Sequence, residues 1–249
     1  MIIDAHCHLP KDLNLSNFLV EKDIAGIEKS VLILNTPKEQ NAFIDQIELA
    51  KKNKNKLGIL VGLDYKNESI LDTLDIFKSN GFKFGIKLHS RFMHFTISDI
   101  DKILESMMNT DFDVAMVDGF VYGPDIETHI FLELLIAVSK AFPNKKIVFA
   151  HSGGIDILRT MLCTRSLDNV YYDLSLTVPY LFDTHIHPDI IHFLKFTHTR
   201  TMFGSDSPDF TTTYALKKFF EIFDEMKLSN EIINNLLYLN ANKIYSDIW

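Results

Sequence analysis

The feature that most constrains the fold of this chain is a regular alternation between short apolar runs and longer amphipathic segments. Runs rich in apolar and β-branched residues, typical of buried strands, lie at 2–5, 30–34, 57–62, 84–88, 114–117, 147–150, 170–174 and 201–204. Segments with helical periodicity lie between or after them, at 16–27, 40–52, 68–79, 97–108, 126–141, 155–162, 189–196, 214–226 and 230–245. Eight strand-helix units in an unbroken series can close a parallel sheet on itself. We therefore predict an α/β fold, specifically a (β/α)8 TIM barrel.

An open, doubly wound sheet is the competing architecture. It would place a glycine-rich phosphate-binding turn after the first strand, whereas residues 5–10 contain no glycine. The chain has 249 residues, a length that one barrel would use completely. Because no internal repeat, linker or low-complexity tract interrupts it, we predict a single domain spanning residues 1–249.

Composition narrows the class of protein. The hydrophobic share of 47% and the charged share of 23% are typical of soluble globular proteins. No apolar stretch is long enough for a bilayer span and no signal peptide is recognisable, so we expect a cytoplasmic protein without a membrane partner. The net charge of -8 opposes binding to nucleic acid, whereas a homo-oligomer stays open. Cys7 and Cys163 are expected to be buried and reduced.

His6 and His8 stand one residue apart at the end of the first apolar run. Side chains two residues apart on a strand share a face, so both imidazoles can reach one metal ion. Alone, so short a motif is more often a solvated turn. Asp206 follows the eighth run, however, and in a closed barrel strands eight and one are neighbours. An aspartate before Ser-Pro can also cap a helix, but with the two histidines it predicts a divalent-metal site, for zinc first and manganese second.

Other chemistry-bearing residues also follow predicted strands. Lys87 and His89 share a face of the fourth run, and Arg91 lies just beyond it. A lysine in a core strand needs an anionic partner, which is either a neighbouring barrel carboxylate or a substrate acid. We predict that Lys87, His89 and Arg91 bind the carboxylate of a small-molecule substrate. His151 ends the sixth run before a glycine-rich turn, as either a capped structural residue or a catalytic one.

The aromatic residues Phe92, Phe120 and Tyr122 follow strand ends as well. Because such positions surround the mouth of a barrel, we expect these side chains to line an aromatic pocket.

Taken in order, several short motifs resemble those of the amidohydrolase superfamily, in particular its amidohydrolase-related branch of metal-dependent hydrolases and decarboxylases. They are Ile3-Asp4-Ala5-His6-Cys7-His8, Gly85-Ile86-Lys87-Leu88-His89, Ala150-His151-Ser152-Gly153-Gly154, Tyr172-Asp173-Leu174-Ser175, Gly204-Ser205-Asp206-Ser207-Pro208 and Leu239-Asn240-Ala241-Asn242-Lys243-Ile244-Tyr245. The resemblance spans nearly the whole chain and implies the same barrel. It further implies that His6, His8 and Asp206 are metal ligands, that Asp206 takes a proton from the attacking water, and that His151 ligates or positions water or substrate.

The chain departs from that family at the end of the fifth strand. Members usually place a metal-binding histidine there, whereas this chain has Asp118 after the apolar run. We predict Asp118 as a substitute oxygen ligand. His89 and His129 would have to be recruited from unusual positions. Some lactonases of the superfamily keep the strand-one histidines and the strand-eight aspartate yet work without a metal, and this chain is similar to them in that respect.

The activity that these residues predict is hydrolysis of an amide, ester or lactone by a metal-activated water, with His151 polarising the carbonyl group. Four alternatives remain open at the level of sequence. Nonoxidative decarboxylation of an aromatic or unsaturated acid would use the same site, and a lactonase would need no metal. A TatD-like nuclease fits the opening motif, but that family carries an acidic ligand on strand four, where this chain has Lys87. A noncatalytic binding barrel would keep only the fold.

Overall fold

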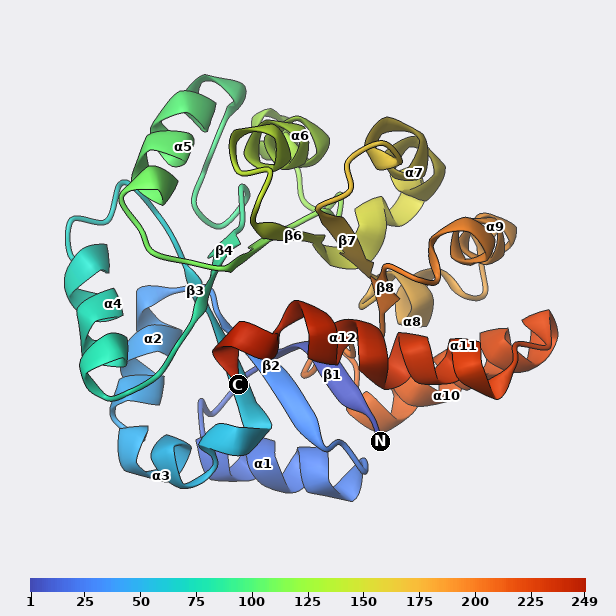
Figure 1. Cartoon of the computed structure of the whole chain (residues 1–249), viewed down its shortest axis with the longest axis horizontal. Helices are drawn as coiled ribbons and strands as arrows, with labels where there is room; N and C mark the ends of the chain where they lie inside the picture. The colour runs from blue at the N-terminus through green and yellow to red at the C-terminus, as the bar shows by residue number, and fades with distance from the viewer.

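Eight parallel strands form the centre of the molecule in the computed structural model, which describes residues 1–249 (Figure 1). Each strand pairs with the next along the chain, in the order β1 to β8. Their bounds are β1 Ile3–His8, β2 Lys29–Leu34, β3 Leu57–Gly62, β4 Gly85–Leu88, β5 Val114–Val117, β6 Lys146–Phe149, β7 Val170–Asp173 and β8 Thr201–Met202. The series matches the predicted runs, with β1 extending further than expected so that it includes both His6 and His8.

The gap between the first and last strands closes beyond the short β8. The Ala5 amide donates a hydrogen bond to the Phe203 carbonyl at 3.0 Å, and the Asp206 amide donates to the His6 carbonyl at 2.9 Å. Cys7 and Ser207 form a parallel bridge one step further. The predicted (β/α)8 TIM barrel is therefore confirmed, and closure places the segment after β8 against β1.

Helices surround the barrel (Figure 1). Their bounds are α1 Leu15–Ile24, α2 Pro37–Ile44, α3 Ile47–Lys52, α4 Ile70–Ser79, α5 Ile100–Met108, α6 Phe131–Ala141, α7 Ile157–Thr164, α8 Thr177–Leu181, α9 His187–Thr197, α10 Thr212–Met226, α11 Asn230–Asn234 and α12 Asn240–Ile244. Apolar side chains between these helices and the outer face of the sheet form the larger core. Cys7 belongs to it, pointing away from the barrel interior as strand alternation requires.

A smaller core fills the barrel interior. Ile3, Ala5 and Val148 from the strands pack there with Ile244 and Tyr245 from the C-terminal segment. In Figure 1, α12 crosses the barrel beside β1 and β2. These apolar side chains occupy the barrel interior and the end that α12 crosses. Polar side chains are therefore expected at the opposite end, where the strands finish.

Several predicted elements are interrupted. The helix expected at 40–52 is two helices, α2 and α3, and the Gln46 side chain between them accepts from the Leu15 amide and donates to the Leu13 carbonyl. The helix expected at 230–245 contains a π-helical turn, Asn235–Leu239. The one at 126–141 begins with a short 3-10 turn, Ile126–Thr128, and α8 was not predicted at all.

The prediction that both cysteines are buried is wrong for Cys163, which is exposed. It lies on α7, whose inward positions are Ile157, Thr160 and Thr164. Helical periodicity turns the residue just before Thr164 away from the barrel.

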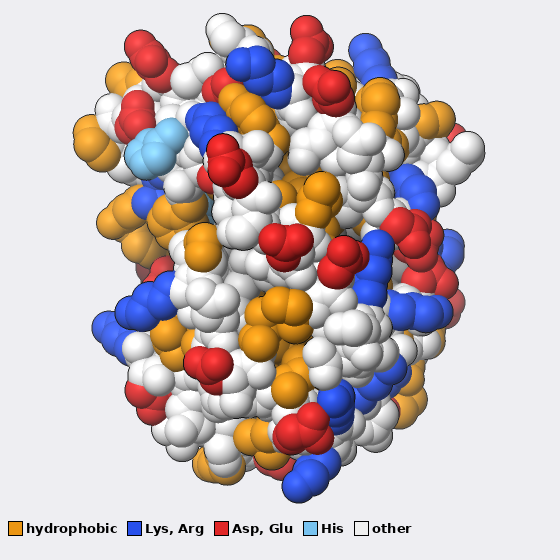
Figure 2. Space-filling model, turned by 90° about the vertical axis from the view of Figure 1, so that its left-hand side faces the viewer, with side chains coloured by type: hydrophobic (Ala, Val, Ile, Leu, Met, Phe, Trp, Pro, Cys, Tyr) orange, Lys and Arg blue, Asp and Glu red, His pale blue; other side chains and the backbone are white.

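The outer surface mixes charges of both signs. On the face shown in Figure 2, acidic and basic side chains are interspersed with small groups of apolar ones, so no single sign of charge dominates it. None of the helices combines the length and the apolar character that crossing a bilayer requires.

Candidate functional site

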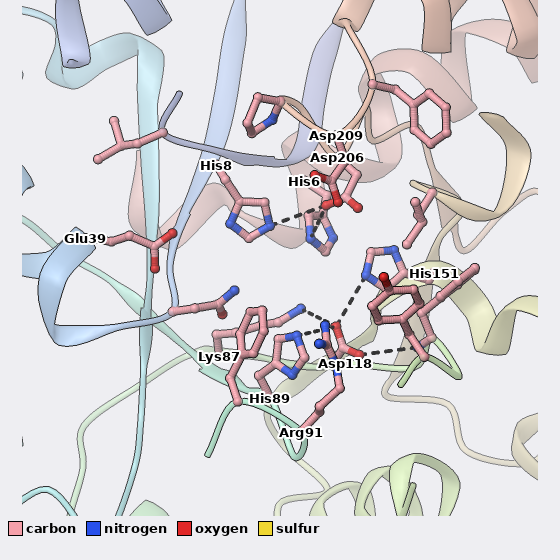
Figure 3. A pocket seen from close by; sticks show the side chains of 18 of the residues that line it. His6, His8, Glu39, Lys87, His89, Arg91, Asp118, His151, Asp206 and Asp209 are labelled. Carbon is pink, nitrogen blue, oxygen red and sulfur yellow. Dashed lines mark hydrogen bonds and ion pairs between the residues drawn. The ribbon is translucent and has the colours of Figure 1, made fainter. Parts of the chain in front are cut away.

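A cavity of about 570 Å³ opens where the strands end, and it contains the side chains that the sequence singled out. His6 and His8 enter from β1, and Asp206 from the segment after β8. The Nε2 atoms of both histidines lie 3.3 Å from Asp206 Oδ1 (Figure 3). Barrel closure thus brings the two histidines near the start of the chain to a carboxylate that follows the last strand.

His6 is oriented by Asp173, the last residue of β7. Its Nδ1 donates to Asp173 Oδ2 at 3.0 Å, which directs Nε2 toward Asp206. The second carboxylate oxygen, Asp173 Oδ1, accepts from the backbone amides of His151 and Ser175. Burial lowers the pKa of His6 to about 4, even though the charge of Asp173 opposes that shift. Asp173 lies within the motif Tyr172-Asp173-Leu174-Ser175 and had no predicted role of its own. Its position as the polar end of an apolar strand is the signal that could have identified it.

His151 lies at the centre of the site. Residues 151–154 all have a positive φ, which turns the chain sharply after β6. The His151 Nδ1 atom lies 2.9 Å from the Ser175 carbonyl oxygen, so this nitrogen is the donor. Nε2 faces the cavity, 3.3 Å from Asp118 Oδ2. Burial lowers the pKa of His151, but the hydrogen bond to Asp118 and the charges of Asp206 and Asp118 outweigh it and raise this pKa to about 9.

Asp118 lies at the centre of a second group of side chains, on the other side of His151 from Asp206 (Figure 3). Its Oδ2 lies 3.5 Å from both Lys87 Nζ and His89 Nε2. Burial opposes ionisation of Asp118, but interactions with His89, Lys87 and His151 hold its pKa well below the ordinary value. The structure therefore brings Asp118 to Lys87, His89 and His151, and not into the group formed by His6 and Asp206.

Aromatic side chains form the mouth of the cavity. Phe92, Phe120 and Tyr122 line it as expected, and Tyr180 and Phe210 line it as well. Arg91, also in the lining, has its guanidinium carbon 4.5 Å from the centre of the Phe92 ring and 4.9 Å from that of Tyr122. The cavity thus has polar groups at its base and flat apolar surfaces at its entrance.

The donor set fits a divalent metal ion. His6, His151 and Asp206 each offer one ligand atom, and these atoms lie within 4.8 Å of one another. His6 Nε2 is buried without a hydrogen-bond partner, an arrangement that a metal ligand explains. Two donors at about 2.0–2.1 Å from a tetrahedral zinc are roughly 3.3 Å apart, which is the spacing of His6 Nε2 and of His8 Nε2 from Asp206 Oδ1. Imidazole nitrogen and carboxylate oxygen are ligands that zinc accepts.

The fold and the site together define a class: a (β/α)8 barrel with imidazole and carboxylate groups gathered where its strands end. A family model described as Amidohydrolase matches residues 1–246. The chain belongs to this amidohydrolase family of enzymes. Comparison with curated protein sequences finds no match.

Solved structures show the same fold at low sequence identity. An uncharacterised TIM-barrel protein from Bordetella bronchiseptica is 15% identical and superposes over 99% of each chain with a TM-score of 0.70. An amidohydrolase from Burkholderia multivorans with bound zinc is 15% identical over 99% of each chain, with a TM-score of 0.67. 5-Carboxyvanillate decarboxylase LigW from Sphingomonas paucimobilis is 13% identical over 99% of each chain, with a TM-score of 0.56. At these identities the likeness concerns the fold.

Proposed function

We propose that this protein is a metal-dependent hydrolase that uses water to cleave an amide, ester or lactone of a small substrate bearing a carboxylate. The observation that carries the proposal is the convergence of His6 Nε2, His8 Nε2 and Asp206 Oδ1, in which the buried His6 Nε2 has no hydrogen-bond partner. Zinc is the first candidate for the ion because of this donor set and because a structural neighbour, the Burkholderia multivorans amidohydrolase, contains zinc.

When bound, such an ion lowers the pKa of a coordinated water to about 7. His6 and His8 would hold the ion together with Asp206, and Asp206 would also accept the proton that the attacking water loses. Interactions with His151, His8 and His6 outweigh burial and keep the pKa of Asp206 below its ordinary value, so this side chain is ionised. Asp206 would therefore serve both as a ligand and as the base.

The remaining side chains would bind and polarise the substrate. His151 Nε2 faces the cavity between the group around Asp206 and the group around Asp118. From there it can donate to the substrate carbonyl oxygen as negative charge develops on that oxygen. Lys87 and Arg91, with His89 beside them, would bind the substrate acid. Asp118 was predicted as a metal ligand, but its contacts with Lys87 and His151 favour the role of their counter-ion.

A second candidate reaction is nonoxidative decarboxylation on the same site. A buried ammonium close to the donor set would suit a reacting carboxylate, and one structural neighbour is named as a decarboxylase. The two reactions differ in their products, since hydrolysis of an ester or lactone releases a proton and decarboxylation releases carbon dioxide.

Metal analysis of the purified protein tests the proposal. We expect close to one equivalent of zinc or manganese in the wild-type protein and almost none in the His6→Ala, His8→Ala double variant. The matched control is the His185→Ala, His192→Ala variant, which removes two exposed histidines and should keep the metal. A folded wild-type protein that takes up neither metal on dialysis would contradict a metal-dependent reaction and favour a metal-free lactonase or a binding barrel.

Replacing Asp173 with asparagine is expected to weaken zinc binding by about 10–100-fold, the usual effect of removing a group that orients a ligand. An asparagine has one acceptor oxygen, so it cannot serve both His6 and the amides of His151 and Ser175. Competition with a chromophoric chelator would measure the affinity, with Asp168→Asn at an exposed position as the control. Equal affinities in the two variants would show that Asp173 does not orient His6.

A further inference from the structure

A positively charged side chain is buried behind the site, outside the cavity. Lys22 of α1 is 3% exposed, and it is absent from the cavity lining. Its Nζ donates to Asp4 Oδ2 at 2.8 Å, Ser207 Oγ at 2.7 Å and Thr212 Oγ1 at 2.6 Å. A buried ammonium is costly unless oxygen atoms surround it, and here they come from three separate segments of the chain.

The partners of Lys22 are neighbours of the predicted metal ligands in the sequence. Asp4 precedes His6 by two residues on β1, and Ser205 and Ser207 lie on either side of Asp206. Asp4 Oδ1 accepts from the Ser205 amide at 2.9 Å, and Asp4 Oδ2 accepts from the Ser205 hydroxyl at 2.6 Å. Lys22 and Asp4 together therefore hold the segment after β8 against β1 from the side opposite the cavity.

The residue held between these contacts is in an unfavourable backbone conformation. Asp206 has a φ of 55°, a left-handed region that costs energy for a residue other than glycine. Such a conformation persists only where surrounding contacts impose it. Here the Asp206 amide donates to the His6 carbonyl, and the hydroxyl of its neighbour Ser207 accepts from Lys22.

We propose that Lys22 is a positioning residue: by binding Ser207 and Asp4, it holds the segment 205–207 so that the Asp206 carboxylate faces His6 and His8. The inference rests on the proposed function in one respect, since it treats Asp206 as a metal ligand. A residue acting through hydrogen bonds in this way should affect both the mobility of the segment and the affinity for the metal.

Two variants test the role of Lys22. Ser207→Ala removes the shorter of the two direct links between the ammonium and the segment, leaving the 3.5 Å contact with Ser205 Oγ, while Asp4 keeps its partner. Lys22→Met removes the charge itself. We expect zinc to bind about 10-fold more weakly to Ser207→Ala and up to about 100-fold more weakly to Lys22→Met. The amides of residues 205–207 should exchange with solvent roughly 10-fold faster in both, because a hydrogen bond to a charged group is lost.

The controls separate positioning from general stability. Leu74→Ala in α4 removes a buried side chain elsewhere in the outer core and should lower the melting temperature without changing zinc affinity or exchange at 205–207. Lys218→Met removes another largely buried lysine, paired with Asp183 and Glu221. If Ser207→Ala matched these controls in both readouts, the positioning role would be overturned. A wild-type protein without zinc affinity would overturn the proposed function, while amide exchange alone would still decide the role of Lys22.

Discussion

Replacing Asp206 with asparagine is expected to lower kcat by roughly 10²–10⁴-fold, the range by which a positioned general base accelerates a reaction. Asparagine fills nearly the same volume, but it cannot accept the proton of the attacking water, and its amide is a poorer ligand than a carboxylate. The segment should stay in place, because Lys22 and Asp4 bind Ser205 and Ser207 and not the Asp206 side chain. The variant should therefore lose activity while remaining folded.

The measurement uses a panel of lactones and esters that carry a carboxylate, with proton release and carbon dioxide followed in parallel. The control is Asp209→Asn, which changes an exposed aspartate that also lines the cavity. Undiminished proton release by Asp206→Asn would rule out the assigned base. Release of carbon dioxide in place of protons by the wild-type protein would identify the reaction as decarboxylation and leave the site itself unchanged.

The barrel could be predicted from the sequence because its eight strands are buried on both faces and read as nearly continuous apolar runs. The number of such runs and the amphipathic segments between them were enough to establish closure. Interruptions inside the helices could not be predicted in the same way. At the break between α2 and α3, the Gln46 side chain bonds to the backbone of Leu13 and Leu15, which lie 33 and 31 residues earlier, and no local pattern contains that contact.

The candidate site was predictable to the extent that it follows from strand order. His6 and His8 meet Asp206 because β1 and the segment after β8 are adjacent in a closed barrel. The groups that orient these side chains were not predictable. Asp173 lies 167 residues from His6 in the chain, and Lys22 lies 185 residues from Ser207. Their contacts depend on rotamers and distances that emerge only after the strands have packed.

Asp118 stays a predicted metal ligand, and the structure places it among other charged groups. Its place after β5 made it a candidate to replace a missing histidine ligand. In the structure, Lys87 from β4, His89 just after that strand and His151 from beyond β6 converge on its carboxylate. The charge of Lys87, which enters from the neighbouring strand, lies beside this carboxylate.

Replacing Lys87 with methionine is expected to lower kcat/KM for a carboxylate-bearing substrate by about 10–100-fold, mostly through KM. A charge-assisted hydrogen bond contributes roughly 1.5–3 kcal/mol, and methionine removes the ammonium while keeping most of the volume. Lys87 is fully buried, and Asp118 Oδ2 at 3.5 Å is its single carboxylate partner. That contact is long for an ion pair between buried groups, so the ammonium retains donor capacity for a substrate acid.

Lys87 could instead serve only as the structural ion-pair partner of Asp118. This role and the substrate-binding role predict different results. If Lys87 binds substrate, Lys87→Met should discriminate between an acid and its methyl ester, with the ester hydrolysed at nearly the wild-type rate. If Lys87 only neutralises Asp118, the activity of Lys87→Met should fall equally on the acid and on the ester, and its melting temperature should fall as well. Adding Asp118→Asn to the same chain should then restore much of the lost melting temperature, since the uncompensated buried charge would be gone. Steady-state kinetics on such an acid-ester pair, with Lys102→Met as the surface control, distinguishes the two roles. If Lys87 binds the substrate acid, the acid end of the substrate lies beside Asp118 and the reacting end beside Asp206 and the other predicted metal ligands.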